Sequence, residues 1–191
     1  PDWIKAAWRQ ARLTHAMSGL ARAASLYVWW PVSLAYNDLV DLKTDEAANW
    51  HRVWQALFDA NLDYAVTNTL AIPKDAVLLY ACVRPVLTEE EFDRLSEFVT
   101  NGGTVLVTFA GPPERPDGEK FVRWDALPKE RIVRTGVSAA DLGQAVQGRL
   151  TTRNWDLGCP PVKTYAYRRG EKRVHLLNNT DANAAATVRI P

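Results

Sequence analysis

The stretch LTEEEFDRLSEFVTNGGTVLVTF, residues 87–109, predicts a helix, a sharp stop and a buried strand. Thr88 can cap this helix, because its hydroxyl can accept from the Glu91 amide while the Glu91 carboxylate accepts from the Thr88 amide. Gly102-Gly103 supplies the left-handed residue that ends the helix. The apolar run Thr104–Phe109 follows at once and is typical of a parallel strand covered on both faces. The stretch therefore predicts one helix-strand unit of an α/β sheet.

The turn after this strand is where many α/β hydrolases hold their nucleophile. Such a turn needs a Ser or Cys between glycines and runs directly into a helix. The sequence at this place is Ala110-Gly111-Pro112-Pro113. We therefore predict that this turn carries no nucleophile.

Length and composition limit the remaining possibilities. A chain of 191 residues can hold one α/β domain with a small appendage. With 23 basic and 22 acidic residues, the net charge of +1 predicts neither a nucleic-acid partner nor an anionic membrane partner. The two cysteines and three histidines lack metal-ligand spacing, so no metal or other cofactor is expected.

The sequence shows no targeting or membrane-spanning pattern. No stretch reaches the roughly 18 apolar residues of a membrane span, and residues 1–25 lack a secretory signal pattern. The sequence begins at Pro1 without an initiator Met, so we expect a fragment of a longer protein. A cytoplasmic location is favoured for this fragment on these grounds, although the parent protein's compartment stays open.

We expect three parts along the chain: a lead-in helix within residues 1–25, an α/β domain over 26–150, and a C-terminal antiparallel β extension over 151–191. Alternating strand and helix patterns in the middle part predict a flavodoxin-like, doubly wound parallel sheet. Its expected strands are Leu26–Trp30, Tyr64–Thr67, Ala76–Cys82, Thr104–Phe109 and Arg131–Arg134. Further helices are expected over 45–61 and over 138–150, the latter with Ser138 as its cap and Asp141 three residues on. The expected strands of the extension are 162–167, 173–177 and 186–190.

Three segments carry a resemblance to a known family: the strand 76–82, the motif LTEEEFDRL at 87–95 and the phrase FVTNGGTVLV at 98–107. They resemble the amidotransferase-like domain that follows the catalytic barrel in bacterial β-galactosidases and related glycoside hydrolases, often called the trimerisation domain. The resemblance implies a class I glutamine amidotransferase-like fold that has lost the nucleophile. It also implies a glycoside hydrolase parent, whose barrel is absent here, and two partners: that barrel and further copies of the chain.

The aromatic residues depart from this family and suggest a second possibility. Trp29, Trp30 and Tyr36 lie at or beyond the end of the first strand, where open sheets bind ligands, and Arg84 follows the third strand. Sugar faces stack on aromatic rings. A carbohydrate-binding domain that uses these residues is therefore an alternative function.

Cys82 supports a third possibility, because it ends a predicted strand. A cysteine nucleophile needs a histidine partner and an electropositive setting. Arg84 is close in sequence, whereas His15, His51 and His175 belong to other predicted elements. We therefore interpret Cys82 as a small buried residue, and an amidotransferase-like hydrolase remains the enzymatic alternative.

The preferred interpretation is a non-catalytic accessory domain that forms oligomers. Eight tryptophans and five phenylalanines are more than one core of this size must bury. Trp3 and Trp8 lie on the predicted lead-in helix, and aromatic side chains outside a core are typical of interfaces. We predict that Trp3 and Trp8 contribute to a subunit or domain interface.

Overall fold

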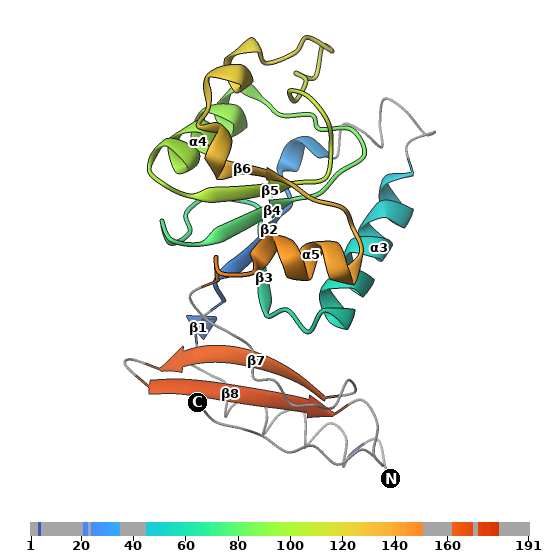
Figure 1. The fold of residues 1–191 in the computed structure, drawn as a ribbon, viewed down its shortest axis with the longest axis vertical. Helices are drawn as coiled ribbons and strands as arrows, with labels where there is room; N and C mark the ends of the chain where they lie inside the picture. Colours follow the sequence, from blue (N-terminus) through green and yellow to red (C-terminus); the bar gives the residue numbers. More distant parts are fainter. Residues whose placement is uncertain are drawn as a thin grey trace.

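The protein contains a parallel and an antiparallel sheet. Its computed structural model describes residues 4, 21–22, 24–34, 45–150, 162–169 and 172–179. The parallel sheet has five strands, and the antiparallel sheet has three (Figure 1). Trp3, Trp8, Tyr36 and the expected strand at 186–190 lie outside the described residues.

The parallel sheet has the strand order β3-β2-β4-β5-β6. Its strands are β2 (Leu26–Trp29), β3 (Tyr64–Thr67), β4 (Val77–Tyr80), β5 (Thr104–Val107) and β6 (Ile132–Arg134). All four neighbouring pairs are parallel, and the first of these strands in sequence lies between the second and the third. This is the flavodoxin-like order, so the predicted fold class is confirmed.

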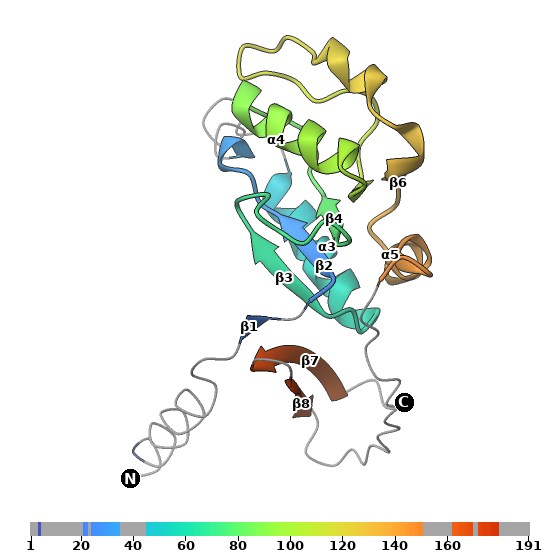
Figure 2. The same ribbon diagram turned by 90° about the vertical axis from the view of Figure 1, so that its left-hand side faces the viewer.

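Helices cover both faces of this sheet. The helix α4 (Glu89–Thr100) lies over one face, whereas α3 (Glu46–Asp59) and α5 (Ala139–Val146) lie over the other (Figures 1 and 2). The three helices predicted within residues 26–150 are therefore present, and the sheet is doubly wound, whereas most of the expected lead-in helix lies outside the described residues. Three short 3₁₀ helices were not predicted, namely η1 (Val32–Leu34), η2 (Val122–Ala126) and η3 (Lys129–Arg131).

The helix α4 begins and ends as its sequence predicts. The Glu91 amide donates to Thr88 Oγ1 at 3.2 Å, and the Thr88 amide donates to Glu91 Oε2 at 2.9 Å. Gly102 takes the left-handed conformation with φ +97°, which favours glycine. Gly103 is needed for a different reason, because a Cβ there would overlap the ring of Phe98. A second predicted cap, Ser138 with Asp141, begins α5.

The connection 111–131 contributes to the core more than its sequence indicates. Its proline- and charge-rich composition is typical of a surface loop, yet Phe121, Trp124 and Leu127 are buried. The Phe121 ring packs on the Phe92 ring of α4. The connection is therefore a covering layer over α4.

The C-terminal extension is antiparallel, as predicted. The strands β7 (Val162–Arg169) and β8 (Lys172–Asn179) form a hairpin. A third strand, β1 (Ala21–Arg22), pairs with β7 and lies between β2 and the hairpin (Figure 2). The lead-in helix expected within residues 1–25 therefore does not include Ala21–Arg22, where the backbone pairs with a strand far away in sequence.

Candidate functional site

The five parallel strands end at one side of the sheet, which we call the carboxyl edge. Open α/β sheets hold their ligand sites at this edge. Trp29, Trp30, Cys82 and Arg84 all lie at or just beyond the ends of β2 and β4. The structure thus brings four of the predicted site residues to one region. The contacts of each residue decide which role it can have.

The neighbouring tryptophans Trp29 and Trp30 have opposite environments. Trp29 is 1% exposed and its ring lies 4.9 Å from the Tyr80 ring, measured between centroids. Trp30 is 41% exposed, and its amide donates to the Thr67 carbonyl at 2.8 Å. Because successive residues of an extended chain point to opposite sides, one indole enters the core and the other reaches the surface. A ligand at this edge can therefore touch Trp30.

Trp30 begins a row of four aromatic rings along the α3 side of the sheet. Successive centroids are separated by 4.5 Å from Trp30 to Trp50, 5.3 Å from Trp50 to Trp54, and 5.6 Å from Trp54 to Tyr64. Trp50 is buried, while Trp54 and Tyr64 are partly buried. This aromatic row holds the exposed Trp30 ring against a rigid support.

A buried carboxylate, Glu46, fixes the turn that follows β4. Its Oε1 accepts from the Val83 amide at 2.8 Å and from the Arg84 amide at 2.9 Å. Glu46 lies in the first turn of α3, so this pair of bonds joins the helix to the turn. Sequence analysis did not predict this role for Glu46, because 37 and 38 residues separate it from the two amides. The available signal was the position of Glu46 in line with the apolar stripe of α3, four residues before Trp50 and seven before Val53.

Cys82 lies in the same turn and is buried. Burial, and then the nearby Glu46 charge, raise the pKa of the Cys82 thiol well above its ordinary value, against a smaller opposite effect of a hydrogen bond with Tyr80. The thiolate is the nucleophilic form of cysteine, so a thiol kept protonated is a weak nucleophile. His51, on α3, is exposed. This setting is the opposite of the electropositive one that the amidotransferase alternative requires.

Arg84 and the residues beyond it are held by further polar contacts. Arg84 Nε contacts Glu114 Oε2 at 3.1 Å, which ties the turn to the connection 111–131. The Val86 carbonyl accepts from Ser33 Oγ at 2.7 Å and from the Tyr80 hydroxyl at 3.3 Å. Burial raises the pKa of Tyr80 well above its ordinary value, so this phenol stays a donor. The turn after β4 is therefore fixed along its length.

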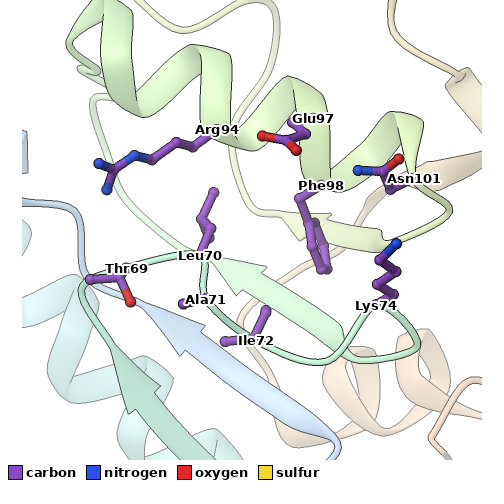
Figure 3. A pocket seen from close by; sticks show the side chains of 9 residues that line it. All are labelled: Thr69, Leu70, Ala71, Ile72, Lys74, Arg94, Glu97, Phe98 and Asn101. Carbon is purple, nitrogen blue, oxygen red and sulfur yellow. The ribbon is translucent and has the colours of Figure 1, made fainter.

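A cavity of about 510 Å³ lies between α4 and the connection from β3 to β4 (Figure 3). Apolar side chains from both segments face each other across it, with charged side chains around them (Figure 3). Arg94, one of the charged residues, pairs with Glu90 at 2.6 Å. The lining residues are Thr69, Leu70, Ala71, Ile72, Lys74, Arg94, Glu97, Phe98 and Asn101.

Within the described residues, no three His, Cys, Asp or Glu side chains are grouped so that they could hold a metal ion. None of the helices in this part of the chain has both the length and the apolar character needed to cross a membrane.

Comparisons with known proteins give a likeness of limited extent. No family model and no curated protein matches the sequence. Among solved structures, the chain is similar to Gan42B, a GH42 β-galactosidase, with 18% identity, a TM-score of 0.40 and 53% of this chain covered. A catalytic mutant of Gan42B from G. stearothermophilus gives 17% identity and a TM-score of 0.36, also over 53% of this chain. In both cases the chain spans 16% of the length of the solved protein.

Proposed function

We propose that this chain is a non-catalytic accessory domain of a glycoside hydrolase and that it provides a docking or oligomerisation surface. The resemblance of residues 76–107 to the amidotransferase-like domain of such enzymes supports this proposal. The motifs that carry the resemblance fold as expected, with the Thr88 cap and the left-handed Gly102 in place. These motifs are structural, so the functional argument rests on the carboxyl edge.

The observation that carries the proposal is that reactive groups at the carboxyl edge serve the fold. The Glu46 carboxylate accepts from two backbone amides, and Cys82 is buried with a raised pKa. In the turn after β5, the Thr108 hydroxyl is hydrogen-bonded to the Cys82 backbone, and Ala110-Gly111 offers no nucleophilic side chain. A catalytic site needs groups free to bind the substrate and exchange protons with it. The edge is built instead as a rigid support.

The proposed docking surface consists of Trp30, Phe58 and Val66, which are 41%, 40% and 57% exposed. Phe58 lies one helical turn beyond Trp54, and Val66 lies on the same face of β3 as Tyr64, so both adjoin the aromatic row. β3 is also an outer strand of the sheet. Exposed apolar side chains that surround a rigid support are typical of interfaces. The proposed partner is the parent's catalytic barrel or a second copy of the chain.

The non-catalytic part is tested by assaying the purified chain with aryl glycosides and with glutamine. We expect no turnover of either substrate, and Cys82→Ala should behave as the wild type does. Glutamine turnover that is lost in Cys82→Ala would overturn the proposal and favour the amidotransferase alternative.

The docking part is tested by light scattering over a concentration series, with Trp30→Gln and Val66→Gln as interface variants. Val122→Gln is the matched control, because Val122 is an exposed valine on η2, away from the aromatic row. We expect self-association, or binding to the parent's barrel, that weakens in the interface variants and persists in the control. Equal association by all three variants would remove this surface from the proposal, leaving Trp3 and Trp8 as the predicted interface residues.

Carbohydrate recognition is the second candidate function. The observation that favours it is the exposed Trp30 ring, supported from behind by Trp50 at 4.5 Å. A flat, immobile ring is what sugar stacking requires. A glycan array with the wild type and Trp30→Ala tests it, and retention on a glycan that disappears in Trp30→Ala would support this candidate.

A further inference from the structure

A separate cavity of about 350 Å³ opens at the carboxyl edge. Residues from the first turns of α3, the turns after β4 and β5, and the loop between β6 and α5 meet around it. Its volume is near the lower end of the range of about 300–1,000 Å³ found for small-molecule sites. The lining residues are Asn49, Cys82, Val83, Pro85, Thr108, Phe109, Ala110, Gly136 and Val137.

Asn49, one of the lining residues, has an unused hydrogen-bond donor. The residue is 6% exposed, and its Nδ2 is buried without a hydrogen-bond partner in the structure. Buried polar atoms in folded proteins nearly always have a partner. An amide nitrogen in this position is therefore suited to a molecule that supplies an oxygen acceptor.

The charges around the cavity select against ions. The lining contains no Lys, Arg, Asp or Glu side chain, so a bound ion would meet no direct counter-charge. Glu46 is close enough for its charge to act on Cys82, and its negative field further opposes an anion. Transfer of an unpaired ion into such a site is costly, whereas a neutral molecule escapes this cost.

The remaining lining is mixed. Val83, Phe109 and Val137 are apolar, and Thr108 adds a hydroxyl. This hydroxyl already accepts from the Cys82 amide at 3.3 Å and donates to the Cys82 carbonyl at 3.4 Å. A ligand with apolar faces and one or a few oxygen atoms matches this arrangement.

We propose that this cavity is a binding site for a small neutral molecule, which presents a carbonyl or hydroxyl oxygen to the side-chain amide of Asn49. The site is separate from the docking surface, and it does not depend on the proposed accessory role. Its ligand is recognised by neutral charge and by the oxygen acceptor.

The experiment uses probes of one shape and different charge. Acetamide, acetate and acetamidinium are titrated into the ¹⁵N-labelled full chain, and the Asn49 side-chain NH₂ signals and the Ala110 and Gly136 amides are followed by NMR. Acetamide should give saturable shifts, and both ions should bind at least about tenfold more weakly. D-glucose is a further neutral probe. Binding of acetamide alone assigns a carbonyl oxygen, and binding of D-glucose alone assigns a hydroxyl oxygen.

Three variants test the site itself. Asn49→Leu removes the amide and should abolish the saturable shifts, while the melting midpoint stays unchanged or rises because no buried donor remains. Asn68→Leu is the control, since Asn68 is exposed and outside the cavity. Ala110→Phe should block the cavity without disturbing the core, because Ala110 is exposed.

Three results would each overturn the proposal. The first is that no neutral probe gives a saturable shift at the highest soluble concentration. The second is that both ions bind as tightly as acetamide does. The third is undiminished binding in a folded Asn49→Leu variant. In the first case the amide of Asn49 is satisfied by water alone.

Discussion

The rings of Phe92 and Phe121 are stacked face to face, with centroids 4.2 Å apart and an angle of 3° between their planes. Phe92 belongs to α4 and Phe121 to the connection 111–131, so the stack joins two segments that no backbone ladder connects. Arg115 covers the Phe121 ring at 4.6 Å, and Arg123 covers the Phe92 ring at 5.0 Å. Glu89 pairs with both guanidinium groups, so the two arginines that cover the rings are also tied to α4.

Phe121→Ala should therefore destabilise the domain strongly. Phe121 is fully buried, and truncating a buried phenylalanine costs about 3–5 kcal/mol through lost burial and the cavity that remains. Urea unfolding followed by tryptophan fluorescence measures the change in the free energy of unfolding. Val122→Ala, at the exposed neighbouring position, should change it little. Similar losses in the two variants would mean that the connection does not pack as described.

The helix stop after α4 makes a second prediction. Gly102→Val places a β-branched residue at φ +97°, which should cost about 1–3 kcal/mol. Gly103→Val should also be destabilising, because its side chain would displace the Phe98 ring. Gly143→Ala is the control, since Gly143 is inside α5 with open space around it, and should be neutral or stabilising. Melting midpoints test all three, and an unchanged midpoint in both valine variants would contradict this description.

Glu46→Ala should loosen the turn after β4. Its removal leaves the Val83 and Arg84 amides without their acceptor, and we expect a loss of about 2–4 kcal/mol in the free energy of unfolding. Asp45→Ala is a matched control, because Asp45 precedes α3 without a side-chain capping bond and is exposed. Hydrogen exchange at the amides of residues 83 and 84 should accelerate in Glu46→Ala alone. Protection that survives the substitution would show that another group accepts from them.

Stability should decline at alkaline pH because of Cys82 and Tyr80. Burial is the main cause that raises the pKa of both groups, so the folded chain keeps protons that the unfolded chain releases. Their contribution is complete below the ordinary cysteine value of 9.0 and is lost as the pH rises above it, with Tyr80 following above 10.0. Unfolding between pH 7 and 11 measures the slope, in a Cys159→Ser background that leaves Cys82 as the single cysteine of the chain. Cys82→Ala should flatten it, and an identical slope in that variant would contradict this assignment.

The sequence was most informative where local patterns act. The caps at Thr88 and Ser138 and the glycine stop after α4 depend on residues within one helical turn of each other, and all three are present. The apolar runs of β4 and β5 also form a local pattern. They predicted a parallel sheet, because both faces of a central parallel strand are covered and its residues are therefore apolar in succession.

Features made by distant residues were missed. The bonds of Glu46 to the turn after β4 and the stacking of Phe121 on Phe92 join segments about thirty or more residues apart, so no local pattern reports them. Hydrophobic periodicity also failed to predict the burial of Trp124, because this residue lies in a short 3₁₀ helix within a segment rich in proline and charged residues. In the candidate site, adjacency in sequence could not show which of Trp29 and Trp30 faces the core.

The pairing of β1 with β7 has a consequence for how the chain acquires its structure. The complete α/β domain lies between these two strands in sequence, so the antiparallel sheet closes a loop that contains the whole domain. Closure of a long loop in an unfolded chain carries an entropic cost that grows with the logarithm of its length. A folded α/β domain shortens the effective distance between the loop ends. The antiparallel sheet should therefore assemble last, after the ribosome has released β7 and β8, and its formation reports that the parallel sheet is already in place.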